Sequence, residues 1–210
     1  MSKIDFYTNP MSRGQIARWA LHEAGAEYEQ HLLDYGTTMK ASEYLRVNPM
    51  GKVPAIVHDA KVVTECAAIC AYLADAFLEA GLRPAPDERA DYYRWMFFAA
   101  GPVEAAITNR MLGVELPQER EMSAGYGNYD QMVAALEGAL SGKDYVCGDR
   151  FTAADIYVGS QVDWGLQFGS LPTSPTFEAY AGRLREREAY KAAKAIDGAL
   201  ISEMQAAAPA

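Results

Sequence analysis

The sequence predicts an α/β domain followed by an all-helical domain. Three observations lead to this fold class. Short apolar runs alternate with helical patterns through the first third of the chain, a short segment rich in glycine and proline follows, and the remainder is a series of helical patterns. We therefore place the α/β domain at residues 1–78, a linker at 79–86 and the all-α domain at 87–210.

Composition and charge narrow the possible partners. Half of the 210 residues are hydrophobic, so the chain can bury a sizeable core. Nineteen basic and 28 acidic residues give a net charge of −9, which argues against nucleic acid or an anionic membrane as the main partner. A small anionic ligand would need a local basic patch.

Cysteine content and the first residues indicate the compartment. Three cysteines are too few and too irregularly spaced for a disulfide framework or a zinc site, so no metal is expected. The chain starts without an apolar signal core, and no apolar run approaches the roughly 18 residues that a membrane span needs. We expect a cytoplasmic protein.

The first predicted elements are a strand and a helix. Residues 3–7 alternate weakly, as a strand does, and Asn9-Pro10 predicts a turn. Ser12 can cap a helix over residues 13–24, which Gly25 ends.

A second strand and a short helix follow. Residues 27–33 predict a strand that runs parallel to the first, because the crossover between the two is long enough. Residues 41–46 predict a short helix, and a turn at Asn48-Pro49 and Gly51 comes next.

Pro54 marks the start of the third strand. Proline has no N–H and suits the first residue of a strand, so Ala55 to His58 is predicted to be one. We predict a cis Val53–Pro54 bond, which would turn the Val53 N–H and C=O outward, where they could pair with an extended peptide.

A hairpin and a helix complete the first domain. Asp59-Ala60 has the spacing of a two-residue hairpin turn before a strand at residues 61–63. Thr64 is predicted to cap a helix that holds Glu65 in its first turn and runs to about Phe77.

The resulting order βαβαββα is that of the thioredoxin-like fold. Thioredoxin itself would carry Cys-x-x-Cys at the start of the first helix. Asn9-Pro-Met-Ser12 occupies that place here, so dithiol chemistry is not available.

The second domain is predicted to be helical throughout. The expected helices cover residues 87–111 with a bend at Gly101-Pro102, 119–140 loosened by two glycines, 152–168, 176–186 and 188–204. Phe151-Thr-Ala-Ala-Asp155-Ile156 predicts a capping box, with Thr152 at the cap and Asp155 at the third helical position.

Two stretches carry a resemblance to a known family. Asn48-Pro-Met-Gly-Lys-Val-Pro54, the short hairpin, and Glu65-Cys-Ala-Ala-Ile-Cys-Ala-Tyr-Leu-Ala-Asp75 resemble the glutathione-binding half of cytosolic glutathione transferases. The Phe151–Ile156 element matches a structural element of that family's helical domain.

The resemblance implies a glutathione site. In the family the valine before the proline pairs through both main-chain groups with the cysteinyl backbone of glutathione, which here is Val53. The γ-glutamyl end would be held by Glu65 and Cys66, and the glycyl carboxylate by Lys52 with help from Lys40. The implied glutathione-binding residues are Lys40, Lys52, Val53, Pro54, Glu65 and Cys66.

The addition of glutathione to an electrophile, which the resemblance implies, requires the thiol in its ionised thiolate form. Lowering a thiol pKa from about 8.5 to about 6.5 needs roughly 2.7 kcal/mol of stabilisation selective for the anion. Hydrogen bonds near a helix N-terminus can supply it. The start of the first helix therefore supplies the catalytic candidates Ser12, Tyr7 and Asn9.

The resemblance leaves the three candidates open. Aligned on Phe6-Tyr7, Ser12 falls where the bacterial beta class has its cysteine. Aligned on residues 16–19, Tyr7 falls where the sigma class has its tyrosine, and Asn9 falls where the tau and theta classes have their serine. We favour Ser12, because its hydroxyl can donate to the sulfur near the exposed backbone N–H groups. Each candidate also has a structural role open to it: Ser12 as the N-cap of the helix, Tyr7 as a half-buried strand aromatic and Asn9 as a turn residue.

The resemblance implies a cytoplasmic homodimeric glutathione transferase of detoxification that adds glutathione, as a co-substrate, to a small hydrophobic electrophile. Alternatives are a glutathione-dependent disulfide reductase or peroxidase, and a non-catalytic member that binds glutathione or a protein. Arg18 is expected to face the helical domain in a structural ion pair. Apolar side chains whose helical spacing fits ordinary core, but which could also line the second substrate's pocket, are Tyr93, Phe97, Met111, Trp164 and Phe168.

Overall fold

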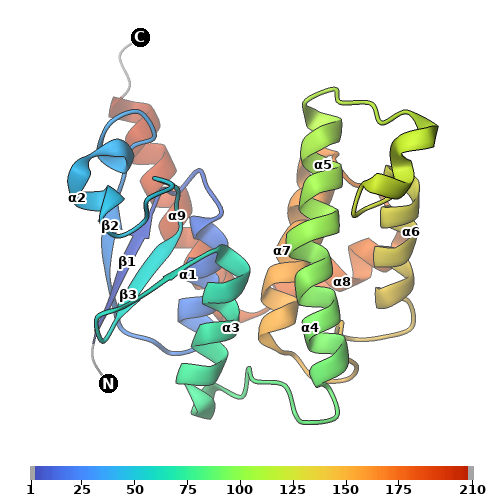
Figure 1. Ribbon diagram of the computed structural model, residues 1–210. Helices are drawn as coiled ribbons and strands as arrows, with labels where there is room; N and C mark the ends of the chain where they lie inside the picture. The colour runs from blue at the N-terminus through green and yellow to red at the C-terminus, as the bar shows by residue number, and fades with distance from the viewer. Residues whose placement is uncertain (1–2, 208–210) are drawn as a thin grey trace. The chain divides into compact units, whose positions relative to one another are not determined.

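The computed structural model describes residues 3–207, which form two compact units (Figure 1). The first unit combines the residues up to Arg83 with those from Glu186 onward, and the second spans Pro84–Arg185. The units are described separately below.

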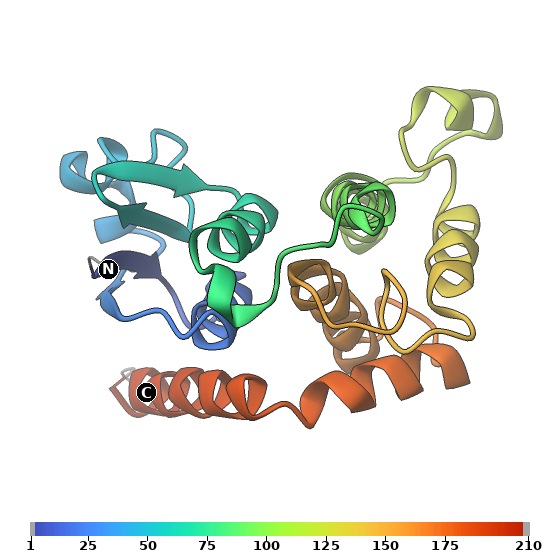
Figure 2. The same cartoon turned by 90° about the horizontal axis from the view of Figure 1, so that it is seen from below.

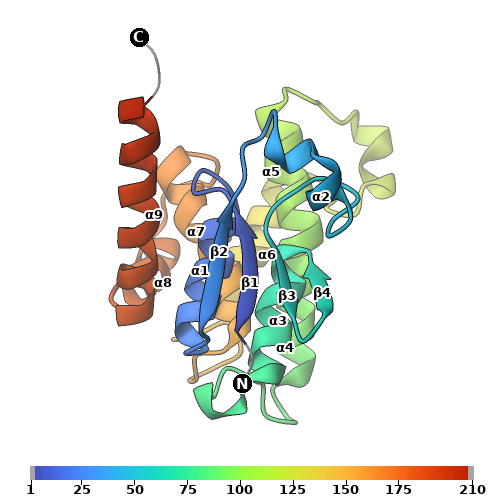
Figure 3. The same ribbon diagram turned by 90° about the vertical axis from the view of Figure 1, so that its left-hand side faces the viewer.

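A mixed sheet forms the centre of the first unit. Its strands are β1 (Ile4–Thr8), β2 (Tyr28–Leu32), β3 (Ala55–His58) and β4 (Lys61–Thr64). They lie side by side in the order β2-β1-β3-β4, with β2 parallel to β1 and the other neighbours antiparallel (Figure 3). The predicted thioredoxin-like order βαβαββα is confirmed.

Two helices cover one face of this sheet. They are α1 (Gly14–Glu23) and α3 (Cys66–Ala76), as Figure 2 shows. Ile4 and Phe6 of β1 are fully buried. The Arg18 guanidinium of α1 lies 5.3 Å from the centre of the Phe6 ring. The short helix α2 (Ser42–Leu45) lies in the connection between β2 and β3.

The β3–β4 hairpin turns at Asp59 and Ala60, as predicted. Both residues have positive φ, 51° and 62°, which the tight two-residue turns that match the twist of a hairpin require. The Val53–Pro54 bond that precedes β3 is cis, also as predicted.

The last helix, α9 (Glu188–Ala207), packs against α1 of the first unit (Figure 2). The Trp19 and Tyr190 rings meet edge to face with centroids 5.1 Å apart, and Arg187 Nε lies 2.6 Å from Glu23 Oε1. The sequence predicts one helical domain over 87–210. By its contacts α9 groups with the first unit, where α1 offers it an aromatic ring and a buried charge to pair with.

Arg18 forms the expected structural ion pair, and its partner lies on α9, within the range 87–210 that the sequence assigns to the helical domain. Arg18 Nε is 3.0 Å from Asp197 Oδ1, and both side chains are buried. The pair therefore holds α9 on the first unit.

The second unit is helical. Its helices are α4 (Arg89–Phe98), α5 (Glu104–Met111), α6 (Tyr129–Leu140), α7 (Ala153–Phe168) and α8 (Pro175–Arg185), shown in Figure 1. A π-helical turn at Ala99–Val103 joins α4 to α5 and contains Pro102. The predicted irregularity at Gly101-Pro102 therefore takes the form of a wider helical turn, since proline removes one backbone donor.

The predicted helix over 119–140 is shorter than expected. A 3-10 helix covers Gln118–Ser123, and α6 begins only after Asn128, whose side chain accepts the Gln131 N–H at 2.9 Å. Gly127, with φ of 64°, separates the two elements, because glycine adopts this conformation without strain.

The capping box of α7 is confirmed. The Thr152 hydroxyl accepts the Ala154 N–H at 3.3 Å, and Asp155 Oδ2 accepts the Thr152 N–H at 2.9 Å. Asp155 is completely buried, and its Oδ1 also accepts the Val146 N–H and the Tyr180 hydroxyl. The box thus ties α7 to α8 and to the preceding loop.

Within residues 3–207, no helix is both long and apolar enough to cross a membrane.

Candidate functional site

The loop between β1 and α1 is held by its own side chains. The Asn9 amide donates to the Leu33 carbonyl at 2.8 Å, and its Oδ1 accepts the Met11 N–H at 2.9 Å. Asn9 is buried, so these contacts give it the role of a turn residue that ties the loop to the end of β2.

The Ser12 hydroxyl occupies the start of α1. It donates to the Asn9 carbonyl at 2.6 Å and accepts the Gly14 N–H at 2.9 Å. The helix begins at Gly14, one residue later than predicted, so the Ser12 oxygen satisfies the N–H of its first residue.

This arrangement lets Ser12 become a donor to a ligand. The Asn9 carbonyl also accepts the Ser12 N–H at 3.1 Å and stays paired if the hydroxyl proton turns away. The oxygen can keep the Gly14 N–H at the same time. Turning therefore gives up one neutral hydrogen bond, about 0.5 to 1.5 kcal/mol.

Gly14 is a site residue that the sequence did not reveal. A Cβ atom at this position would lie 2.0 Å from Thr8 Oγ1 and 3.0 Å from Ser12 Oγ. Both Thr8 and Gly14 are buried. The close approach of α1 to β1 therefore requires glycine next to the candidate serine.

Tyr7 lies on the face of the sheet opposite to α1. Its ring stacks on His31 with centroids 4.7 Å apart and packs on a cluster that contains Met39, Tyr44 and Ala55. Burial, followed by the charge of Asp5, raises the pKa of Tyr7. A less acidic phenol is a poorer donor to an anion, so the geometry favours the structural role for Tyr7.

Val53 presents an unpaired main chain. Within the described residues neither its N–H nor its C=O makes a hydrogen bond. The residue before it is firmly held, because the Lys52 carbonyl accepts the Tyr44 hydroxyl at 2.5 Å and the Asn48 amide at 2.8 Å. The segment is an ordered, open edge of the kind that accepts an extended peptide.

Tyr44 and Asn48 are positioning residues for this edge. Both are buried. Asn48 could be suspected from the turn that it begins, whereas nothing in the sequence around Tyr44 indicates a contact with Lys52.

Glu65 departs from its predicted place. We expected Thr64 to be the cap and Glu65 to lie in the first turn, but α3 begins at Cys66 and Glu65 precedes it with φ of 64° and ψ of 113°. Positive φ in a non-glycine residue costs on the order of 1 to 3 kcal/mol and recurs at functional sites. The Glu65 carboxylate is exposed and contacts no donor within residues 3–207.

Cys66 connects the starts of two helices. Its sulfur lies 3.5 Å from the Arg13 carbonyl oxygen, and the side chain is 7% exposed. The thiol is therefore directed at the protein itself.

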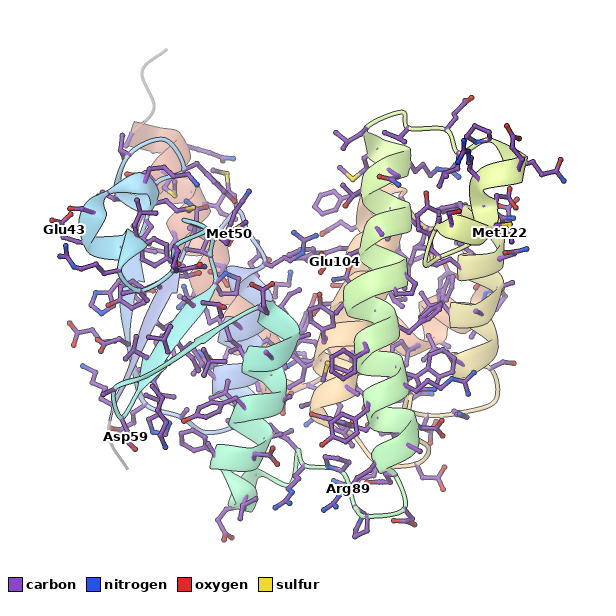
Figure 4. The ribbon with its side chains drawn as sticks, viewed as in Figure 1. Glu43, Met50, Asp59, Arg89, Glu104 and Met122 are labelled. Carbon is purple, nitrogen blue, oxygen red and sulfur yellow. The ribbon has the colours of Figure 1, made fainter. Side chains whose placement is uncertain are left out.

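The two lysines differ in their surroundings. Lys40 Nζ donates to the Gly51 carbonyl at 2.7 Å and to the Met50 carbonyl at 3.3 Å, so it holds the turn on which Met50 projects (Figure 4). Lys52 is exposed, and in the described part of the chain its ammonium group contacts no acceptor. Of the two, only Lys52 offers a charge without a partner.

The candidate site thus joins three segments of the first unit. Cys66 links the start of α3 to the start of α1, and Tyr7 packs on the same cluster as Val53. The structure gives Tyr7, Asn9 and Lys40 contacts that support the fold. It leaves Lys52, Val53 and Glu65 open to a ligand, and Ser12 able to turn toward one.

The apolar candidates of the helical unit are more exposed than core residues. Tyr93, Phe97, Met111 and Phe168 are between 49% and 76% exposed, and Trp164 is half-buried. Their spacing fitted core, but the faces of α4, α5 and α7 that carry the four exposed side chains are not covered within their own unit.

Comparisons with known proteins find the same family in the first and the second part of the chain. The model of the glutathione S-transferase N-terminal domain matches residues 2–75, and that of the C-terminal domain matches residues 74–164. Protein LigF of Sphingobium sp. is 47% identical over 65% of this chain and 68% of its own. Glutathione transferase GST 23 of Zea mays is 32% identical over 83% of this chain and 81% of its own.

Solved structures show the same similarity. A glutathione transferase from Methylococcus capsulatus is 30% identical, with a TM-score of 0.77 over 93% of this chain and 98% of its own. A sphingomonad glutathione S-transferase complexed with glutathione is 29% identical, with a TM-score of 0.74 over 92% and 98%. Together with the two domain matches, which cover most of the chain, these likenesses show that the protein belongs to the glutathione transferases, in their bacterial form.

Proposed function

We propose that this glutathione transferase binds glutathione along Val53, ionises its thiol beside Ser12 and joins the glutathionyl sulfur to a hydrophobic electrophile. One observation carries the proposal: the Val53 N–H and C=O are unpaired while Tyr44 and Asn48 hold the preceding carbonyl in place. An extended peptide can add to such an edge through main-chain hydrogen bonds.

The charges around the edge complement glutathione. The exposed Glu65 carboxylate suits the γ-glutamyl ammonium group, and the exposed Lys52 ammonium suits the glycyl carboxylate. In a protein of net charge −9, a lysine without a partner at this position matters for an anionic ligand.

Ser12 supplies the stabilisation of the thiolate. A hydrogen bond from its hydroxyl to the anion contributes about 1.5 to 3 kcal/mol, and the N-terminal end of α1 adds about 0.3 to 1 kcal/mol. The loss of the bond to the Asn9 carbonyl offsets part of this. The remainder, about 2 kcal/mol, is of the same order as the roughly 2.7 kcal/mol that two pKa units require.

Once the thiolate has formed, the transfer of the glutathionyl group depends mainly on how the sulfur and the electrophile are positioned. The thiolate sulfur donates an electron pair to the electrophilic carbon, a C–S bond forms, and the leaving group departs with the electron pair of its own bond. The protein contributes proximity and a stabilised anion.

Titration of bound glutathione tests the proposal. The thiolate absorbance of the complex is measured against pH for the wild-type protein, Ser12→Ala and Tyr7→Phe. We expect Ser12→Ala to raise the pKa of the bound thiol by one unit or more, about the worth of one charge-assisted hydrogen bond, and Tyr7→Phe to leave it nearly unchanged.

Ser12→Thr, which keeps a hydroxyl group, is the matched control and should retain much of the pKa depression. A pKa that does not move in Ser12→Ala would remove Ser12 from the mechanism. Tight binding of glutathione without any depression of its pKa in the wild type would contradict the transferase mechanism and favour a non-catalytic binding protein.

A further inference from the structure

Gln15 connects the loop beside the candidate serine to the C-terminal helix. Its Nε2 donates to the Pro10 carbonyl at 2.6 Å, and its Oε1 accepts from Lys194 Nζ of α9 at 2.7 Å. All three residues belong to the first unit, although 179 residues separate Gln15 from Lys194 in the chain.

Charge and donor chemistry determine the orientation of this amide. A lysine ammonium can only donate, and a proline carbonyl can only accept. The Gln15 oxygen must therefore face Lys194 and its NH2 group must face Pro10. A flipped amide would place two donors together at one end and two acceptors at the other.

The Gln15 contact completes the support of the loop. Each carbonyl of residues 9–11 accepts a side-chain donor: Asn9 from Ser12, Pro10 from Gln15, and Met11 from the Tyr35 hydroxyl at 3.1 Å. In the described part of the chain the Pro10 carbonyl has no other partner. Pro10 is buried, so water does not readily reach its carbonyl. Loss of the Gln15 donor would therefore leave the carbonyl without a hydrogen-bond partner.

The position of Lys194 is itself fixed by α9. Lys194 is half-buried, and its ammonium lies 5.5 Å from the centre of the Tyr190 ring. Asp197, one helical turn further on, anchors the same face of α9 to Arg18. Lys194 therefore reaches Gln15 from a helix that is anchored to α1 before Lys194, through Arg187, and after it, through Asp197.

We propose that Gln15 and Lys194 are positioning residues, through which α9 sets the geometry of Ser12 and hence the pKa of the bound glutathione thiol. This inference rests on the proposed function of Ser12. A hydrogen bond to a thiolate depends steeply on distance and angle, so a loop that shifts by a fraction of an ångström weakens it.

Gln15→Glu is the sharpest variant. The carboxylate keeps the pairing with Lys194 but cannot donate to the Pro10 carbonyl. We expect the pKa of the bound thiol to rise and kcat/KM with a chloronitrobenzene below about pH 7 to fall about tenfold, with a smaller change in the dissociation constant of glutathione. Lys194→Met should show the same change in weaker form, and Lys194→Arg should restore most of the activity.

Lys191→Met is the matched control. Lys191 lies on the same helix but pairs with the exposed Glu186 and Glu188, so its replacement should change neither the pKa nor kcat/KM. The melting temperature of each variant is measured as well, to distinguish a general loss of stability from a specific effect on the bound thiol. A general loss of stability would not by itself shift a pKa that is measured well below the unfolding transition.

The outcomes distinguish the two proposals. If Ser12→Ala raises the thiol pKa while Gln15→Glu and Lys194→Met titrate like the wild type, the positioning proposal is overturned and the proposed function stands. If Ser12→Ala has no effect, the role of Ser12 fails, and amide hydrogen exchange decides the positioning proposal. Faster exchange at Met11 and Ser12 in Gln15→Glu, but not in Lys191→Met, would support it, and unchanged exchange would overturn it.

Discussion

At the scale of single residues, Cys66 stands at a candidate glutathione-binding position, but its side chain is directed at the protein itself. The glutathione transferase pattern places a γ-glutamyl contact here. The thiol points at the Arg13 carbonyl, 3.5 Å away, and a thiol is a weak donor. We therefore expect the contribution of Cys66 to come from its main chain.

Cys66→Ala should bind glutathione with less than a tenfold loss of affinity, because the main chain remains and alanine fits the buried site. Isothermal titration with glutathione measures this. Glu65→Gln serves as the comparison and should bind more weakly, since it removes the negative charge that we propose pairs with the γ-glutamyl ammonium group of glutathione. A tenfold or larger loss in Cys66→Ala would show that the thiol itself holds the ligand.

Residue identities indicated some members of the candidate site and not others. Ser12, Val53 and Glu65 stand in recognisable patterns of turn and helix start. Gly14 was not visible, because its requirement comes from the approach of Thr8. Gln15 was equally hidden, since a glutamine in the first turn of a helix indicates nothing about a distant lysine.

At the scale of elements, the start of α7 depends on one buried carboxylate. Asp155 accepts the Thr152 and Val146 N–H groups and the Tyr180 hydroxyl. The capping box alone predicted a loss of about 1 to 2 kcal/mol on removal of this side chain. The additional partners increase that value, because buried donors are left without acceptors.

Asp155→Ala should lower the free energy of unfolding by about 2 to 4 kcal/mol, measured by urea denaturation. Asp130→Ala is the matched control, since Asp130 is an exposed acid in the first turn of α6, and we expect a change of about 0.5 kcal/mol or less. A melting temperature equal to that of the wild type would refute the structural role of Asp155.

At the scale of the whole molecule, α9 completes the first unit from the far end of the chain. Arg18 is fully buried, and its Nη1 donates to Tyr28 and Gln30 at 3.0 Å each while its Nε pairs with Asp197. Burial raises the pKa of Asp197, and the charge of Arg18 opposes this shift. A buried charge that loses its partner destabilises a fold more than the pair stabilises it.

Asp197→Ala should therefore cost about 3 to 5 kcal/mol of unfolding free energy in urea denaturation. The double variant Arg18→Met with Asp197→Leu should recover a large part, because no charge remains buried. Asp144→Ala, which breaks the exposed pair with Arg183, should cost about 1 kcal/mol or less. Equal losses in Asp197→Ala and Asp144→Ala would contradict the importance of burial.

The sequence by itself determined the order of strands and helices, the hairpin turn at Asp59 and Ala60, the cis bond before Pro54 and the capping box of α7. Each depends on residues that are close in the chain, where backbone preferences and side-chain spacing act directly. The family followed from the same short-range patterns.

Only the tertiary structure decided that α9 belongs to the first unit, that Glu65 adopts a positive φ, and that Gln15 joins Pro10 to Lys194. It also decided that Phe97 and Phe168 stay exposed. Helical spacing is identical for a face that is buried and a face left open, so periodicity cannot distinguish them. Pairing between groups far apart in the chain depends on how the elements pack, which the order of residues along the chain does not show.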